Sequence, residues 1–174
     1  MSATSASTRN GTVTLLTPIP QGDDISEREG DSIKVQSIEL SGGVFRDPAS
    51  TSNEAVRVMI VRDLQNQAAA PAASDILQTV GTAYAPFQPI DFLNGNDINK
   101  RFTIVYDELT FVDSYHPTSI VHMKSNHDCH VFFRGTGSTV ASSGNGTYFL
   151  VVISDTATNS ANFYFTSRVR FTDN

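Results

Sequence analysis

The residues best suited to chemistry are carboxylates that crowd one short segment near the start of the chain: Asp23, Asp24, Glu27, Glu29 and Asp31. Carboxylate oxygens are the hard ligands that Ca²⁺ prefers, so this density could form a calcium site. The spacing is not that of an EF-hand, because Ser26 and Arg28 occupy ligand positions if Asp24 begins the loop. A solvated acidic loop therefore remains the alternative to a metal site.

A second group combines imidazoles with the one cysteine of the chain: His122, His127, Cys129 and His130. Imidazole and thiolate are the natural ligands of zinc. In an extended strand, however, Cys129 and His130 point to opposite faces, and the sequence has no further Cys–His group to complete a tetrahedron. We expect Cys129 to be a small buried residue, since a single cysteine cannot form an internal disulfide.

Sequence motifs of enzymes are missing. The glycine-rich segment 135–138 lacks the Gly-Lys-Ser/Thr ending of a phosphate-binding loop, and the chain contains no Gly-x-Ser-x-Gly and no His-Glu-x-x-His. The sequence therefore predicts that the protein is not an enzyme.

Composition limits the partners. Eighteen acids against twelve bases give a net charge of −6, which opposes unspecific binding to nucleic acid. The longest apolar run, Tyr148–Ile153, is far shorter than the roughly 20 residues that cross a bilayer, so we expect no membrane partner. Residues 1–12 are rich in Ser and Thr and are expected to be a disordered N-terminal arm, with residues 13–174 as one folded domain.

The elements that must position these residues are strands. Apolar positions repeat with period two, as in Phe163, Phe165, Val169 and Phe171, and long helical periodicity is absent. The pattern predicts an all-β fold of eight antiparallel strands near residues 13–17, 32–44, 54–63, 101–113, 118–124, 128–134, 147–154 and 162–172. This number is typical of a jelly-roll sandwich. The strand at 147–154 does not alternate, so we expect it to be buried on both faces and central.

Two local features interrupt this pattern. The parity of apolar positions switches between Val35 and Ile38 and again between Tyr106 and Leu109, and each switch predicts a β-bulge. A long mid-chain insertion, residues 65–99, separates two strands, and within it residues 72–78 could form a short helix with Ser74 or Asp75 as N-cap. We expect the insertion and the turn at 46–53 to contact neighbouring subunits, because apolar Phe87, Ile90, Phe92 and Leu93 need cover.

Several motifs resemble those of one family. Gln21-Gly22-Asp23-Asp24-Ile25 and Arg28-Glu29-Gly30-Asp31 have the spacing found at the start of the jelly roll in the satellite tobacco necrosis virus coat protein family. Further similar segments are Val61-Arg62-Asp63, Lys100-Arg101-Phe102-Thr103-Ile104 and Phe171-Thr172-Asp173-Asn174. Related segments occur in capsid proteins of small circular single-stranded DNA viruses. The matches follow the same order along roughly residues 13 to 174.

The resemblance implies a viral capsid protein of the virion, self-assembled as a homo-oligomer into the smallest icosahedral shell (T=1), with calcium at subunit contacts. Asp23 would then match an acid at the threefold axis, Glu29 and Ser32 would offer backbone carbonyls, and Asp173 would supply a carboxylate from the chain end.

One departure concerns the genome. Members of the family carry a basic N-terminal helix that binds it, whereas Arg9 is the one base before Arg28 here. We therefore expect this chain to bind nucleic acid weakly or not at all.

A calcium-dependent carbohydrate- or ligand-binding β-sandwich is the alternative function, because it uses the same fold class. The absence of Trp weakens it, since a sugar site usually presents an aromatic platform.

Overall fold

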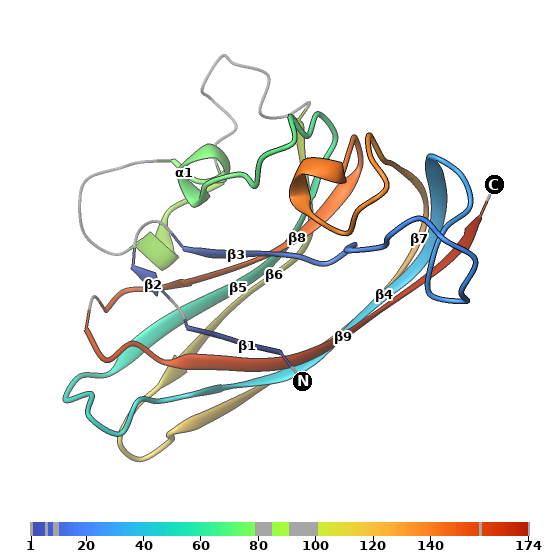
Figure 1. Cartoon of the computed structure of the whole chain (residues 1–174). Coiled ribbons are helices and arrows are strands. Elements are labelled where there is room, and N and C mark those ends of the chain that lie inside the picture. The colour runs from blue at the N-terminus through green and yellow to red at the C-terminus, as the bar shows by residue number, and fades with distance from the viewer. Residues whose placement is uncertain are drawn as a thin grey trace.

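The computed structural model describes residues 2–5, 7–8, 11–78, 85–90, 101–156 and 158–173. These residues form two sheets that face one another, as Figure 1 shows. The elements are β1 (Ser2–Ser5), β2 (Ser7–Thr8), β3 (Thr12–Leu15), β4 (Ser32–Phe45), β5 (Glu54–Asp63), α1 (Ala73–Ile76), η1 (Ala85–Phe87), β6 (Phe102–Val112), β7 (Thr118–Phe132), η2 (Val140–Ser142), β8 (Thr147–Ser154) and β9 (Asn162–Asp173).

The strand order is that of a jelly roll. One sheet, called sheet A below, has the order β1-β9-β4-β7, and the other, sheet B, has the order β2-β8-β5-β6 with β3 also paired to β8. Except for the parallel pair of β2 and β8, the pairs are antiparallel. When β2 is set aside, each sheet contains four strands, and the predicted all-β jelly-roll sandwich is confirmed.

The identity of two strands differs from the sequence-based expectation. Residues 118–124 and 128–134 were expected as two strands, but a single long strand, β7, covers Thr118–Phe132. The eighth strand comes instead from β1 and pairs with β9, so residues 2–5 and 7–8 form strands rather than a disordered arm outside the folded domain. Strands pair through backbone hydrogen bonds, which do not depend on apolar side chains. The polar composition of residues 2–8 therefore gives no hydrophobic pattern from which a strand could be predicted.

Apolar side chains fill two regions. The main core lies between the sheets and includes Ile38, Leu40, Val58, Leu150 and Phe163, which are fully buried. A second cluster lies on the outer face of sheet B, where Met59, Val61, Val151 and Ile153 pack against Ala73, Ile76 and Leu77 of the insertion. Every residue of β8 is buried, because this strand lies between the two regions; the expected burial of both its faces is confirmed.

The two bulges and the short helix lie at or near the positions predicted from the sequence. The register of β4 shifts between Val35 and Ser37, as predicted. In β6 the shift falls at Val105, because Ile60 pairs with Tyr106 and Val61 pairs with Ile104, slightly earlier than expected. The helix begins after Ala72, whose N–H donates to the Asp75 carboxylate at 2.8 Å, so Asp75 stabilises the first turn from inside the helix.

Part of the insertion lies outside the described residues, including Phe92 and Leu93. Within the described ranges, Ile90 packs against the second cluster, whereas Phe87 is 48% exposed. Among those same residues, no helix is long and apolar enough to cross a membrane.

Candidate metal site

The acidic loop between β3 and β4 is anchored by the buried cation of Arg28. The Arg28 guanidinium is fully buried, donates hydrogen bonds to the carbonyls of Gly30 and Gly135, and lies 4.1 Å from the centre of the Phe133 ring. Its Nη1 is also 3.6 Å from the Asp31 carboxylate. Arg28 therefore joins the acidic loop to the loop that follows β7, and these contacts restrain the backbone that carries the surrounding carboxylates. Sequence reasoning did not identify this role, since an arginine among acids looks like a surface residue.

Backbone hydrogen bonds shape the rest of the loop. The Glu27 N–H donates to the Asp24 carbonyl at 2.8 Å, and the Asp24 N–H donates to the Glu27 carboxylate at 3.1 Å. The Gly22 N–H donates to the Arg28 carbonyl at 3.0 Å, which closes the turn. These bonds hold the carboxylates of Asp23 and Asp24 at the exposed tip of the loop.

The chain end meets this loop. The Asp173 carboxylate, in the last described residue of β9, accepts a hydrogen bond from the backbone N–H of Glu29, which is 144 residues away in the sequence. The Glu29 carbonyl in turn accepts a hydrogen bond of 2.6 Å from the Gln21 side-chain amide. A carbonyl has two lone pairs, so this hydrogen bond leaves one of them for another donor or for a cation.

An open hollow of about 310 Å³ separates the acidic loop from the end of β9. It is lined by Gly22, Asp23, Asp24, Ile25, Glu27, Glu29, Phe171 and Asp173. Three of the four predicted ligand residues, Asp23, Glu29 and Asp173, thus lie around one space. Ser32, the fourth, is the first residue of β4, half-buried and outside the lining of this hollow.

No set of three His, Cys, Asp or Glu side chains in the described part of the chain converges on one point that could hold a metal ion. This applies also to the His–Cys group. His122 and His130 are exposed on the outer face of β7, whereas Cys129 and His127 are half-buried on its inner side, so these side chains point in opposite directions.

Comparison with known proteins decides the family. The family model described as satellite tobacco necrosis virus coat protein matches residues 1–174. This chain belongs to the satellite tobacco necrosis virus coat protein family. It is 32% identical over 163 residues to the coat protein of Satellite tobacco necrosis virus 2, covering 89% of this chain and 75% of that protein. It is also 32% identical over 147 residues to the capsid protein of Satellite tobacco necrosis virus 1, covering 83% and 70% respectively.

Family membership decides between the capsid function and the alternative functions that the sequence left open. The chain is a structural capsid protein of the virion and not an enzyme, as predicted. A coat protein acts as many assembled subunits, so the expected assembly of copies is also supported at this level. The carbohydrate-binding alternative has no counterpart among these relatives.

Proposed function

We propose that the chain assembles into a T=1 icosahedral shell and that calcium stabilises the contacts between subunits. The ligands in this proposal are the carboxylates of Asp23 and Asp173 and the backbone carbonyls of Glu29 and Ser32. The observation that carries it is the hydrogen bond between the Asp173 carboxylate and the Glu29 N–H, which brings the chain end to the acidic loop.

The donor chemistry fits calcium. The hollow beside the loop is lined by carboxylates and contains neither His nor Cys, and Ca²⁺ takes six to eight oxygen ligands from carboxylates, carbonyls and water. Within the described part of one chain, no three carboxylates converge on a single point. We infer that ligands from other copies of the chain complete the site. Exposed acids such as Asp23 are accessible for such sharing.

At a site shared between subunits, calcium would neutralise carboxylates that otherwise repel one another. Carboxylates from symmetry-related copies repel one another when they approach, and a bound cation removes this repulsion. Contacts related by rotation that close around an axis form a shell rather than a filament. Removal of calcium is therefore expected to loosen the contacts without unfolding the subunit, since the sandwich core is apolar.

The experiment measures particle mass by light scattering and particle shape by negative-stain microscopy, with and without a calcium chelator. The expected result is uniform hollow particles that swell or dissociate on chelation and recover when calcium is restored. Asp23→Asn and Asp173→Asn should abolish the chelator response, because they remove the charge that the cation neutralises.

A matched control is Asp113→Asn. Asp113 accepts hydrogen bonds of 2.7 and 2.6 Å from the N–H groups of Tyr115 and His116 in the loop between β6 and β7, so the change removes one negative charge at a distance from the hollow and leaves an acceptor in place. This variant should respond to the chelator like the parent protein. Particles that keep their size in chelator would refute the calcium proposal, and a monomer under every condition would refute the shell proposal.

A further inference from the structure

Glu54, the first residue of β5, is a buried acid. It is 1% exposed, and its Oε1 accepts hydrogen bonds from the Ser154 hydroxyl and from the Ala161 N–H, the latter at 2.7 Å. Ser154 is the last residue of β8, and Ala161 immediately precedes β9. One carboxylate oxygen therefore holds both ends of the segment between these strands, which we call the β8–β9 loop.

The second oxygen of Glu54 has no such partner. In the described part of the chain, Oε2 is buried and accepts no hydrogen bond, so nothing replaces the water that it loses on folding. Asp155 lies close enough to Glu54 for the two charges to repel each other. Its Oδ1 accepts a hydrogen bond of 3.0 Å from the N–H of Ala55, the residue next to Glu54. Two carboxylates thus meet at the start of β5, and we call Glu54 and Asp155 the acid pair.

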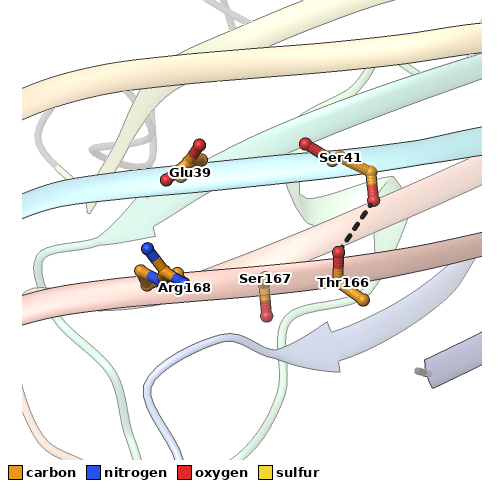
Figure 2. Close-up of a pocket in the computed structure, with 5 residues that line it drawn as sticks. All are labelled: Glu39, Ser41, Thr166, Ser167 and Arg168. Atoms are coloured by element: carbon orange, nitrogen blue, oxygen red, sulfur yellow. Dashed lines mark hydrogen bonds between the residues drawn. The ribbon is translucent and has the colours of Figure 1, made fainter.

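Other carboxylates in the two sheets lie beside cations. Asp107 pairs with Arg57 at 2.6 Å, and Glu39 stands in register with Arg168 on the neighbouring strand, as Figure 2 shows. Within the described residues, however, neither member of the acid pair forms an ion pair. In the same part of the chain no third acid joins the acid pair to form a group that could hold a metal ion.

The charged groups on the neighbouring loops have other partners. Between β4 and β5, Arg46 donates to the carbonyl of Ser50, and Asp47 accepts a backbone hydrogen bond within the same loop. Between β6 and β7, Asp113 lies 3.4 Å from His116. Figure 1 shows these two loops and the β8–β9 loop at the end of the sandwich that lies away from the acidic loop. A proton, rather than one of these groups, is therefore what can reduce the charge of the acid pair.

We propose that the acid pair is a proton-dependent latch for the β8–β9 loop, which is closed while the pair holds one proton and is released when both carboxylates are ionised. In the closed state Asp155 holds the proton, and Glu54 keeps its two hydrogen bonds, which are strong because the acceptor is charged. When Asp155 is ionised as well, two like charges face each other without a cation. Movement of the β8–β9 loop into water relieves this repulsion.

The direction of the pH dependence follows from Asp155. Burial raises the pKa of Asp155 above its usual 3.8, the hydrogen bond from the Ala55 N–H opposes this rise, and the Glu54 charge adds to it. The closed loop thus binds the proton more tightly than the open loop does. Its stabilisation by the proton is complete below pH 3.8 and is lost as the pH rises through the raised pKa.

Hydrogen exchange of the full chain tests the latch. The amides of Ala55 and Ala161, which donate to the acid pair, are followed between about pH 4 and 7, and each rate is divided by the intrinsic rate at that pH. Release of one proton on opening makes opening up to about tenfold more frequent per pH unit within the titration range. Asp155→Asn keeps an oxygen for the Ala55 N–H but cannot ionise, so its opening should not depend on pH. Amides of β8, which is buried throughout, report global unfolding and separate it from loop opening.

The matched control is Asp128→Asn, which removes the same single charge at an exposed residue on β7 and should keep the pH dependence of the parent protein. Glu54→Gln removes the like charge beside Asp155, so it should lessen the pH dependence of opening, although the loss of charge-assisted hydrogen bonds speeds opening at every pH. An unchanged pH dependence in Asp155→Asn, or an equal change in Asp128→Asn, would overturn the proposal.

A bound cation is the competing explanation for the acid pair. A calcium chelator added at acid pH should leave the exchange of the Ala161 amide unchanged, because a proton closes the latch. A chelator that opens the loop in the parent protein but not in Asp155→Asn would assign the acid pair to a cation and refute the latch.

Discussion

The guanidinium of Arg57 donates hydrogen bonds to both carboxylate oxygens of Asp107, at 2.7 Å from Nε and 2.6 Å from Nη2. Its Nη1 donates to the carbonyls of Pro86 and Gln88 at 3.1 and 2.6 Å. One nearly buried arginine on β5 thus fixes an acid on β6 and a segment of the long insertion. The insertion is tied to sheet B by charge as well as by the apolar contacts of α1.

Loss of Asp107 should destabilise the subunit, because it leaves the Arg57 cation nearly buried without its counter-ion. We expect Asp107→Ala to lower the free energy of unfolding by about 2 kcal/mol, less than for a fully buried pair because Asp107 is 29% exposed. Urea unfolding of the dissociated chain measures this. The control is Asp128→Ala, which breaks the exposed pair with Lys34 and should cost less than about 1 kcal/mol. An equal loss of unfolding free energy in both variants would contradict a larger contribution from the Arg57–Asp107 pair.

His127 should make stability depend on pH in the acid range. Burial, with the Arg62 charge adding to it, lowers the pKa of His127 below its usual value of 6.5. The unfolded chain therefore takes up the proton more readily, and stability is lost as the pH falls from 6.5 through the lower pKa of the folded state. His127→Phe keeps the ring that lies 5.4 Å from Tyr148 and should flatten this loss in thermal unfolding between pH 7 and pH 5. The exposed His122→Gln should leave the loss unchanged; a variant of His127 with the parent profile would count against this assignment.

Tyr148 should limit stability in alkali. Burial raises the pKa of Tyr148 to about 12 from its usual 10.0. The folded state keeps the proton more tightly, so its stability is full below pH 10 and falls as the pH rises through 10 to 12. The total loss is about 3 kcal/mol, as two pKa units imply.

Tyr148→Phe should remove this alkaline loss, as measured by urea unfolding at pH 9 to 12. The Tyr148 hydroxyl meets the Cys129 thiol, which is a weak hydrogen-bond partner, so the same variant should change stability at pH 7 only slightly. Tyr115→Phe, at a residue that is 88% exposed, provides the comparison and should retain the full decline. An unchanged decline in Tyr148→Phe would show that another group is responsible.

Assembly should depend on an exposed aromatic pair formed by one residue of the insertion and one residue of β6. Phe87 and Phe111 are 48% and 59% exposed, with ring centres 6.2 Å apart. If this surface meets a neighbouring subunit, Phe111→Ser should reduce the yield of particles in light scattering and leave the urea midpoint of the subunit unchanged. Phe111→Leu keeps an apolar side chain and should restore assembly. Normal assembly of Phe111→Ser would place the contact elsewhere.

Deletion of residues 66–95 would also test whether the insertion contacts a neighbouring subunit, but a substitution separates assembly from folding more clearly. That segment includes Ala73, Ile76 and Leu77, which cover Met59 and Val151 on sheet B. Its removal would expose part of the core, so a failure to assemble would not separate misfolding from a lost contact.

Local patterns in the sequence predicted most of the sandwich. Alternation located β4, β5, β6 and β9, and the unbroken apolar run of β8 predicted a strand buried on both faces. β1 was missed, because its Ser- and Thr-rich sequence has no apolar alternation and its partner β9 lies at the other end of the chain. For the candidate metal site, the sequence supplied the residue types and the family resemblance supplied the set of four. The proximity of Asp173 to Glu29 required the folded chain.

The sequence by itself determined most of the strands, the two-sided burial of β8, the absence of an enzyme motif and the membership of a coat protein family. These properties depend on residue order, side-chain periodicity and composition, which are local. The tertiary structure alone decided that Arg28 is a buried anchor and that the Asp173 carboxylate accepts a hydrogen bond from the Glu29 N–H. A sequence pattern is local, whereas the pairing of β4 with β9 brings residues together that lie far apart in the chain.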